Sequence, residues 1–147
     1  MSKQALSGIR VLDFSQVLAG PFATQLMAQL GAEVIKIEQP VGGDMTRGLM
    51  SASSDGMAPS FLAANLGKRS LTLDLKNPKA DEIVHKLVAK ADVIVENFKP
   101  GTIDRLGFGY EAMKAIKPDL VYASISGFGQ TGPRASLPAF DGAIQAY

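Results

Sequence analysis

Segments that suit β-strands alternate along this chain with segments that suit helices, and this alternation is what most constrains its fold. Residues 9–15 are rich in apolar and β-branched side chains, and apolar residues then recur at helical spacing from Pro21 to Leu30. The alternating segment 33–38 predicts a second strand. A strand, a helix and a strand within about 30 residues form a βαβ unit with parallel strands and a right-handed crossover.

The same order continues through the rest of the chain. Further strands are predicted at residues 70–75, 92–98 and 120–126. Helical segments are predicted from Asn77 (N-cap) and Pro78 onward, at residues 104–107, and at residues 110–116. Residues 39–60, rich in Gly, Pro and Ser, predict a long loop of the kind that is often functional. The fold class is therefore α/β, a Rossmann-like open, mostly parallel sheet with helices on both faces.

Composition excludes several classes of function. The 147 residues predict one domain and contain no Cys, which excludes disulfides, thiolate metal sites and a Cys nucleophile. His85 is the only His, so a multi-histidine metal site is excluded as well, and we expect His85 on the solvated face of its helix. No metal is expected. The net charge of +1 weighs against nucleic-acid binding.

Hydropathy predicts where the protein resides. The apolar stretches are shorter than the roughly 18 residues that a membrane span needs. The N-terminus lacks the apolar core of a signal peptide. We therefore expect a cytoplasmic protein that does not enter a membrane.

Residues suited to ligand binding follow the predicted strands. In open α/β sheets, ligands bind beyond the carboxyl ends of the strands. The residues at these ends are a loop at 16–20, Lys76, Asn97, Phe98, Lys99, Arg105 and a glycine-rich loop at 127–130. Cations, amides and an aromatic ring at one edge suit a ligand that has phosphates and a flat ring.

Other polar residues allow more than one interpretation. The first strand–helix loop lacks the G-x-G-x-x-G pattern of dinucleotide sites, so Glu38 is interpreted as a surface carboxylate rather than a ribose ligand. Lys68 and Arg69 suit a phosphate clamp or a solvated pair equally well. Asp13 is expected to hold loop N–H groups, and Asp44 to pair with Arg47.

Six blocks of sequence, in order, carry a resemblance to a known family. They are residues 6–21, 30–38, 43–48, 65–70 with 73–76, 91–101 with 106–107, and 126–129 with 141–146. This set closely resembles the N-terminal part of family III CoA-transferases, the formyl-CoA and carnitine-CoA transferase group, whose superfamily includes α-methylacyl-CoA racemases.

The resemblance implies a function and a set of contacts. It implies that residues 1–147 are a truncated, N-terminal CoA-binding domain of an enzyme that moves CoA between an acyl-CoA and a carboxylic acid. CoA is then a substrate, and no tightly bound cofactor is expected. Contacts to CoA and its acyl group are implied for Gln16, Val17, Leu18 and Ala19, contacts to the adenosine and its phosphates for Leu73 and Lys76, and further CoA contacts for Asn97, Phe98 and Arg105.

The family mechanism is covalent catalysis by an aspartate. That aspartate lies in a Gly-Asp motif expected beyond residue 147, so no catalytic residue is assigned within the chain and the fragment itself is expected to be inactive. Asp141 is interpreted as an N-cap for a helix that begins at Gly142. The family also implies an interlocked homodimer for the full-length protein.

Three departures bear on the substrate and the reaction. Leu18 stands where several members carry Gln, and Gln39 where formyl-CoA transferases tend to carry Arg, which brings the formyl–oxalate substrate pair into question. Phe140 stands where the racemases carry a catalytic His, which favours the transferase. The racemase and a non-catalytic CoA or acyl-CoA binding module are kept as alternatives.

Overall fold

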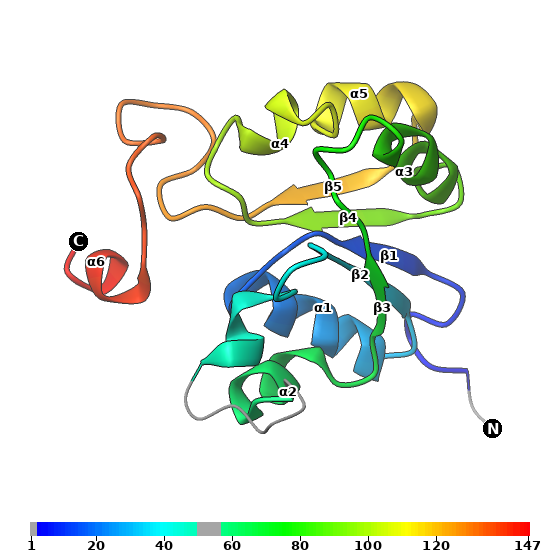
Figure 1. The fold of residues 1–147 in the computed structure, drawn as a ribbon, viewed down its shortest axis with the longest axis horizontal. Coiled ribbons are helices and arrows are strands. Elements are labelled where there is room, and N and C mark those ends of the chain that lie inside the picture. Colours follow the sequence, from blue (N-terminus) through cyan, green and yellow to red (C-terminus); the bar gives the residue numbers. More distant parts are fainter. Residues whose placement is uncertain (1–2, 50–56) are drawn as a thin grey trace.

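A five-stranded, fully parallel sheet forms the centre of the computed structural model, which describes residues 3–49 and 57–147 (Figure 1). The strand order is β3-β2-β1-β4-β5. The strands are β1 (Arg10–Asp13), β2 (Glu33–Glu38), β3 (Arg69–Thr72), β4 (Val93–Glu96) and β5 (Val121–Ser124). The order reverses between β1 and β4, which is where Rossmann-like sheets bind their ligands. The predicted fold class is confirmed.

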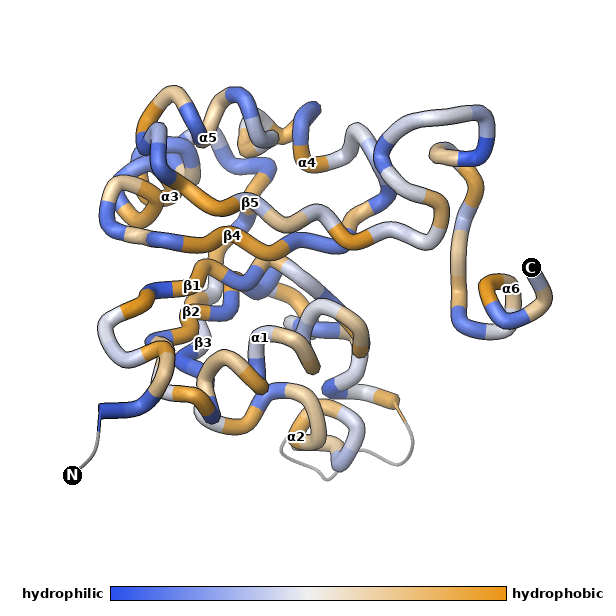
Figure 2. Tube along the Cα trace, turned by 180° about the vertical axis from the view of Figure 1, so that it is seen from behind, coloured by the Kyte–Doolittle hydropathy of each residue, from blue (hydrophilic) through white to orange (hydrophobic). Residues whose placement is uncertain are grey.

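Helices cover both faces of the sheet, as the sequence predicts. Helices α1 (Ala19–Gln29) and α2 (Pro59–Asn65) pack together on one face, and α3 (Ala80–Val88), α4 (Thr102–Arg105) and α5 (Tyr110–Ile116) lie on the other (Figure 1). A short 3-10 helix, η1 (Met45–Gly48), follows β2. The last helix, α6 (Asp141–Gln145), ends a segment that lies outside the two helix layers, beyond the carboxyl edge of the sheet (Figure 2).

Two apolar cores hold these layers together. Successive residues of a strand point to opposite faces, so Leu12 of β1 enters the core beneath α3 and α5, and Val11 enters the core beneath α1. Ile94 and Val95 of β4 divide between the two cores in the same way. This explains why the central strands are almost continuously apolar in sequence.

Three local predictions are wrong, and each concerns where a helix begins. Part of the expected loop 39–60 is helical: α2 begins at Pro59, whose missing N–H suits a first helical position, and buries Phe61 and Ala64. Residues 50–56 of that loop lie outside the described residues. Helix α3 begins at Ala80 with Lys79 as its N-cap, and Asn77 accepts a hydrogen bond from the Lys79 N–H (3.0 Å) in the turn before it.

The interpretation of Asp141 as an N-cap is also wrong. Phe140 is the N-cap of α6, and Asp141 is the first helical residue. The carboxylate of Asp141 accepts a hydrogen bond from Gln145 Nε2 (2.8 Å), one turn further along the helix. Asp141 therefore closes a side-chain bridge along α6 rather than capping its N–H groups.

Within residues 3–49 and 57–147, no three or more His, Asp or Glu side chains gather in a way that could hold a metal ion. His85 is exposed on α3, as predicted. No helix in these two ranges is long and apolar enough to cross a membrane.

Candidate functional site

The turn between β1 and α1 lies at the carboxyl edge of the sheet and has an unusual backbone. Val17 has φ 69° and is the one non-glycine residue with a positive φ in the described parts of the chain. A β-branched residue is rarely found in this left-handed region, where the strain amounts to about 1–3 kcal/mol. Such a conformation persists only where neighbouring groups impose it.

Asn97 bonds the residue that precedes Val17. Asn97 follows β4, the strand paired with β1, so its side chain lies beside the turn. Its Oδ1 accepts the Gln16 N–H (2.8 Å), and its Nδ2 donates to the Gln16 carbonyl (2.7 Å). The amide therefore holds both backbone polar groups of Gln16.

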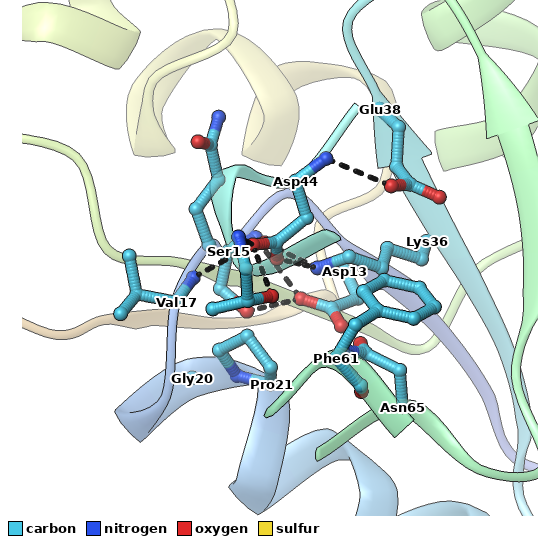
Figure 3. A network of polar contacts seen from close by, with 12 residues as sticks. Asp13, Ser15, Val17, Gly20, Pro21, Lys36, Glu38, Asp44, Phe61 and Asn65 are labelled. Carbon is cyan, nitrogen blue, oxygen red and sulfur yellow. Dashed lines mark hydrogen bonds and ion pairs between the residues drawn. The ribbon is translucent and has the colours of Figure 1, made fainter. Parts of the chain in front are cut away.

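A buried ion pair lies on the other side of the turn (Figure 3). The Lys36 ammonium lies 2.9 Å from Asp44 Oδ2, and both side chains are almost fully buried. Lys36 also donates to the Ser15 carbonyl (2.7 Å), and Asp44 Oδ1 accepts the Val17 N–H (3.3 Å). Burial alone would raise the pKa of Asp44, but hydrogen bonds from Lys36 and Thr46 outweigh it and lower that pKa.

A second buried pair supports the start of the turn. Asp13 Oδ2 lies 2.8 Å from the Lys68 ammonium, and its Oδ1 accepts the Ser15 N–H (3.0 Å). Lys68 makes two further bonds, to the Pro21 carbonyl and to Asn65 Oδ1 (2.8 Å each). The prediction that Asp13 holds loop N–H groups is confirmed.

These contacts decide between the two interpretations of Lys68 and Arg69. All three hydrogens of the Lys68 ammonium are engaged inside the protein, so this residue is neither a phosphate clamp nor solvated. Arg69 is exposed and pairs with Glu33 (2.9 Å) on the strand next to it. Burial lowers the pKa of Lys68, and the Asp13 carboxylate opposes that shift.

Glu38, at the end of β2, is the centre of a third buried cluster. It is 4% exposed and accepts two hydrogen bonds from Arg47 (2.8 Å each), one from Ser70, and one from the Asp44 N–H (2.9 Å). Burial pushes its pKa upward, but these donors outweigh it and bring the pKa of Glu38 to about 2. The predicted surface carboxylate and the predicted Asp44–Arg47 pair are both wrong: Arg47 pairs with Glu38, and Asp44 pairs with Lys36.

Beside the turn, a pocket of about 400 Å³ opens at the switch point between β1 and β4. It is lined by Gln16, Val17, Leu18, Ala19, Asn97, Phe98, Lys99, Ala139, Phe140 and Asp141. Most of these side chains are apolar, and the exposed Lys99 contributes a cation. The arrangement can hold a ligand with an apolar body and an anionic group.

The pocket brings together six of the nine candidate residues, namely Gln16, Val17, Leu18, Ala19, Asn97 and Phe98. Leu73 instead packs against the core beneath α3. Lys76 is exposed in the turn after β3, and Arg105 is exposed on α4 with its guanidinium bonded to Thr102 Oγ1 (3.0 Å). These three residues lie outside the pocket lining.

Strand-end reasoning missed one wall of the pocket. Ala139, Phe140 and Asp141 come from the segment before and at the start of α6, which follows the last strand by many residues. No strand boundary marks them, so only the path of the chain in space places them opposite Gln16 and Phe98.

A second, wider hollow of about 800 Å³ lies along β5, α4 and α5, with Asp104, Tyr110 and Tyr122 in its lining. Glu96, buried near it, accepts the Phe98 N–H (2.8 Å) and so fixes the backbone at the first pocket. Burial raises the pKa of Glu96, and the nearby Asp104 carboxylate adds to the rise. The Tyr122 hydroxyl donates to the Phe108 carbonyl (2.9 Å), and burial raises its pKa.

The sheet order defines a Rossmann-like α/β fold with a pocket at its switch point. The family model described as CoA-transferase family III matches residues 6–147, and the chain belongs to this family. The resemblance of the six sequence blocks to that family is thereby confirmed.

Individual relatives support the same assignment. The chain is 45% identical to the succinate–glutarate CoA-transferase of Agrobacterium fabrum, over 97% of this chain and 37% of that protein. It is 47% identical to the formyl-CoA:oxalate CoA-transferase of Streptomyces coelicolor, over 99% of this chain and 35% of that protein. The chain thus spans about a third of the length of these curated relatives.

Solved structures agree with the fold. A CAIB/BAIF family protein from Brucella suis superposes with a TM-score of 0.92 at 44% identity, over 99% of this chain and 39% of that one. The Rv3272 protein of Mycobacterium tuberculosis superposes with a TM-score of 0.86 at 40% identity, over 96% of this chain and 39% of that one.

Proposed function

We propose that residues 1–147 form the CoA-binding domain of an enzyme that transfers CoA from an acyl-CoA to a carboxylic acid. The observation that carries the proposal is the pocket at the switch point, which gathers Gln16, Val17, Leu18, Ala19, Asn97 and Phe98. The family resemblance independently implies CoA contacts for these six residues. The match to the family over residues 6–147 supports the reaction class.

The pocket also favours a class of acyl group. Leu18 is 60% exposed at the pocket, and Phe98 and Phe140 add aromatic surface to the lining. No amide is present at position 18 to receive a small, polar acyl group. We therefore propose a donor with an apolar acyl portion rather than formate or oxalate, with Lys99 available to a phosphate or a terminal carboxylate.

Lys76 and Arg105 are proposed to act at a distance from this pocket. Both are exposed, so they are accessible to the phosphates of a long ligand that extends beyond the pocket. Leu73 is proposed to lie beside the adenosine, where its partly buried side chain supports the wall of the site.

The proposed chemistry proceeds through a covalent aspartyl intermediate, with the nucleophile in a segment outside residues 1–147. The aspartate attacks the thioester carbonyl, which expels the CoA thiolate and forms a mixed anhydride. The thiolate then attacks the aspartyl carbonyl, which releases the donor acid and leaves an aspartyl-CoA thioester. The acceptor carboxylate attacks that thioester, and the released thiolate attacks the new acyl carbonyl, which regenerates the aspartate.

Two further properties of the complete protein belong to the proposal. We expect a cytoplasmic enzyme, and a homodimer whose two chains interlock. Size measurement of the complete protein by light scattering tests the dimer.

Calorimetric titration of the chain with CoA tests the binding proposal, and we expect a micromolar Kd. Incubating the complete protein with acyl-CoA and then with borohydride tests the chemistry, because reduction of the thioester converts the nucleophilic aspartate into homoserine. α-Proton exchange on a 2-methylacyl-CoA in deuterated water, without an acceptor acid, would identify a racemase instead. CoA binding by the complete protein without either reaction would identify a binding module.

A further inference from the structure

Four consecutive backbone polar groups in the turn after β1 are each held by a side chain from elsewhere in the fold. Lys36 of β2 donates to the Ser15 carbonyl (2.7 Å). Asn97, after β4, bonds the Gln16 N–H and the Gln16 carbonyl (2.8 and 2.7 Å), and Asp44 accepts the Val17 N–H (3.3 Å). Three side chains from three places in the sequence thus converge on three residues.

This convergence coincides with the left-handed conformation of Val17. Left to itself, a valine would leave this region, because its β-branched side chain crowds the backbone there. The peptide unit that precedes Val17 cannot rotate freely, since its Gln16 carbonyl and its Val17 N–H are both bonded. Holding that peptide plane from both ends fixes the orientation of the turn.

We infer that Asn97, Lys36 and Asp44 are positioning residues that hold the Gln16–Val17 peptide in the orientation that shapes the pocket. This differs from the direct CoA contact that the family resemblance implies for Asn97. The Asn97 amide is engaged at both its oxygen and its nitrogen by Gln16. Asn97 itself lines the pocket, but its bonded amide also holds the turn, whose residues Gln16 to Ala19 form much of the lining.

The ion pair contributes in a different way from the amide. Asp44 is buried with Lys36, and its Oδ1 also accepts the Thr46 N–H and hydroxyl (2.9 and 2.7 Å). These contacts fix the position of the carboxylate that accepts the Val17 N–H. The turn thus rests on a rigid partner on one side and on a single amide side chain on the other, and the amide is the part that can be changed without leaving a charge unpaired.

The test uses Asn97→Ala in the 147-residue chain, with Asn77→Ala as the matched control. Asn77 also bonds a backbone N–H with its side chain, but in the exposed turn before α3. We expect Asn97→Ala to speed amide hydrogen exchange at Gln16 and Val17 by at least about tenfold, while the β1 amides keep their protection. Asn77→Ala leaves both turn amides unchanged. Unchanged exchange at Gln16 and Val17 in Asn97→Ala would overturn the inference.

A double-mutant cycle with Val17→Gly separates positioning from direct contact, using CoA as the probe. Glycine adopts a positive φ without strain, so the turn depends less on Asn97 in that background. We expect Asn97→Ala to weaken CoA binding about tenfold in the parent chain and no more than about twofold in Val17→Gly. An equal loss in both backgrounds would assign Asn97 to direct contact and overturn the inference.

The binding readout rests on the proposed function, and the exchange readout does not. If the parent chain fails to bind CoA, the proposed function fails for this chain, and exchange alone decides the positioning role. If Asn97→Ala speeds exchange at the turn but leaves CoA affinity unchanged, Asn97 holds the turn without affecting the shape of the CoA pocket, and the inference is wrong.

Discussion

The two sides of the carboxyl edge of the sheet use their polar residues in opposite ways. On the side of β1, β2 and β3, the charged groups of Lys36, Asp44, Glu38 and Lys68 are buried and paired with one another or with their neighbours. On the side of β4, Phe98 and Lys99 line a pocket and lie partly or fully open. Both sides have charged residues at or just beyond strand ends, but Asp13 and Glu38, at the ends of β1 and β2, are engaged within the fold, whereas Lys99 stays exposed at the pocket.

The difference teaches how to interpret strand-end residues. A polar side chain at the end of a strand can bind a ligand only if the fold has not already engaged it. On the side of β1, β2 and β3, helix α2 engages two of the cations. Its Asn65 accepts a hydrogen bond from the Lys68 ammonium, and the ring of its Phe61 lies 3.7 Å from the Arg47 guanidinium. After β4, by contrast, Lys99 stays exposed at the pocket.

The largest expected effect comes from breaking the buried side. Lys36→Met leaves the Asp44 carboxylate and the Ser15 carbonyl without their cation, which should destabilise the fold by about 3–5 kcal/mol. Lys86→Met removes an exposed i,i+4 pair with Glu82 and should cost less than about 1 kcal/mol. Urea unfolding of both variants measures the difference. Similar midpoints would contradict the contrast between the two sides.

Acid should lower the stability of the fold through Glu38, on the side of β1, β2 and β3. The folded pKa of Glu38, about 2, lies below its ordinary value of 4.5, so its contribution is complete above pH 4.5. That contribution, on the order of 3 kcal/mol, should be lost as the pH falls from 4.5 toward 2. The free energy of unfolding, measured by urea titration at several pH values in this range, should depend less on pH for Glu38→Gln than for the parent chain. The control Glu82→Gln changes an exposed carboxylate, and its curve should follow that of the parent.

Substitutions on the side of β4 should change CoA affinity rather than the free energy of unfolding. Lys99→Ala removes a cation from the pocket, and CoA affinity should fall by at least about tenfold, since a charge-assisted hydrogen bond contributes about 1.5–3 kcal/mol. Unfolding free energy should change by less than about 0.5 kcal/mol because the side chain is exposed. Lys90→Ala, at the opposite end of β4, is the calorimetric control. A stability loss without a binding change would place Lys99 with the buried side.

The smallest expected effect concerns acyl preference. Leu18→Gln adds an amide to the pocket without disturbing the core, because Leu18 is 60% exposed. The ratio of affinities for oxalyl-CoA and butyryl-CoA should shift about threefold toward oxalyl-CoA, as expected for one added hydrogen bond. Free CoA should bind both proteins equally. An unchanged ratio would show that position 18 does not contact the acyl group.

Sequence reasoning located the pocket better than it described its surroundings. The residues after β1 and β4 were predicted because strand ends are visible in the sequence as the limits of apolar runs. Phe140 and Asp141 were missed as pocket residues because nothing in their local sequence records that the chain returns to the sheet edge. Helix α2 was missed because seven residues with no long apolar stripe give little periodicity, and tertiary packing of Phe61 and Ala64 stabilises it.

The fates of Glu38, Asp44 and Lys68 show where local reasoning ends. The sequence predicts a surface position for Glu38, an Arg47 partner for Asp44, and either a phosphate clamp or a solvated charge for Lys68. All three side chains are instead buried in ion pairs. A charged residue can be solvated, bind a ligand or be buried in an ion pair. The local sequence does not distinguish these three cases. Burial becomes favourable only when several donors and acceptors meet at once, as the four donors around Glu38 do.

The sequence by itself determined the class of fold, the order of most elements and the family, because apolar periodicity and ordered motifs are properties of the chain alone. Only the tertiary structure decided which polar groups are engaged and which stay open. That choice depends on distances between segments far apart in sequence, such as Lys36 with Asp44 and Gln16 with Asn97. The same geometry holds Val17 in a conformation that its side chain disfavours, and only contacts made in the folded state can do so.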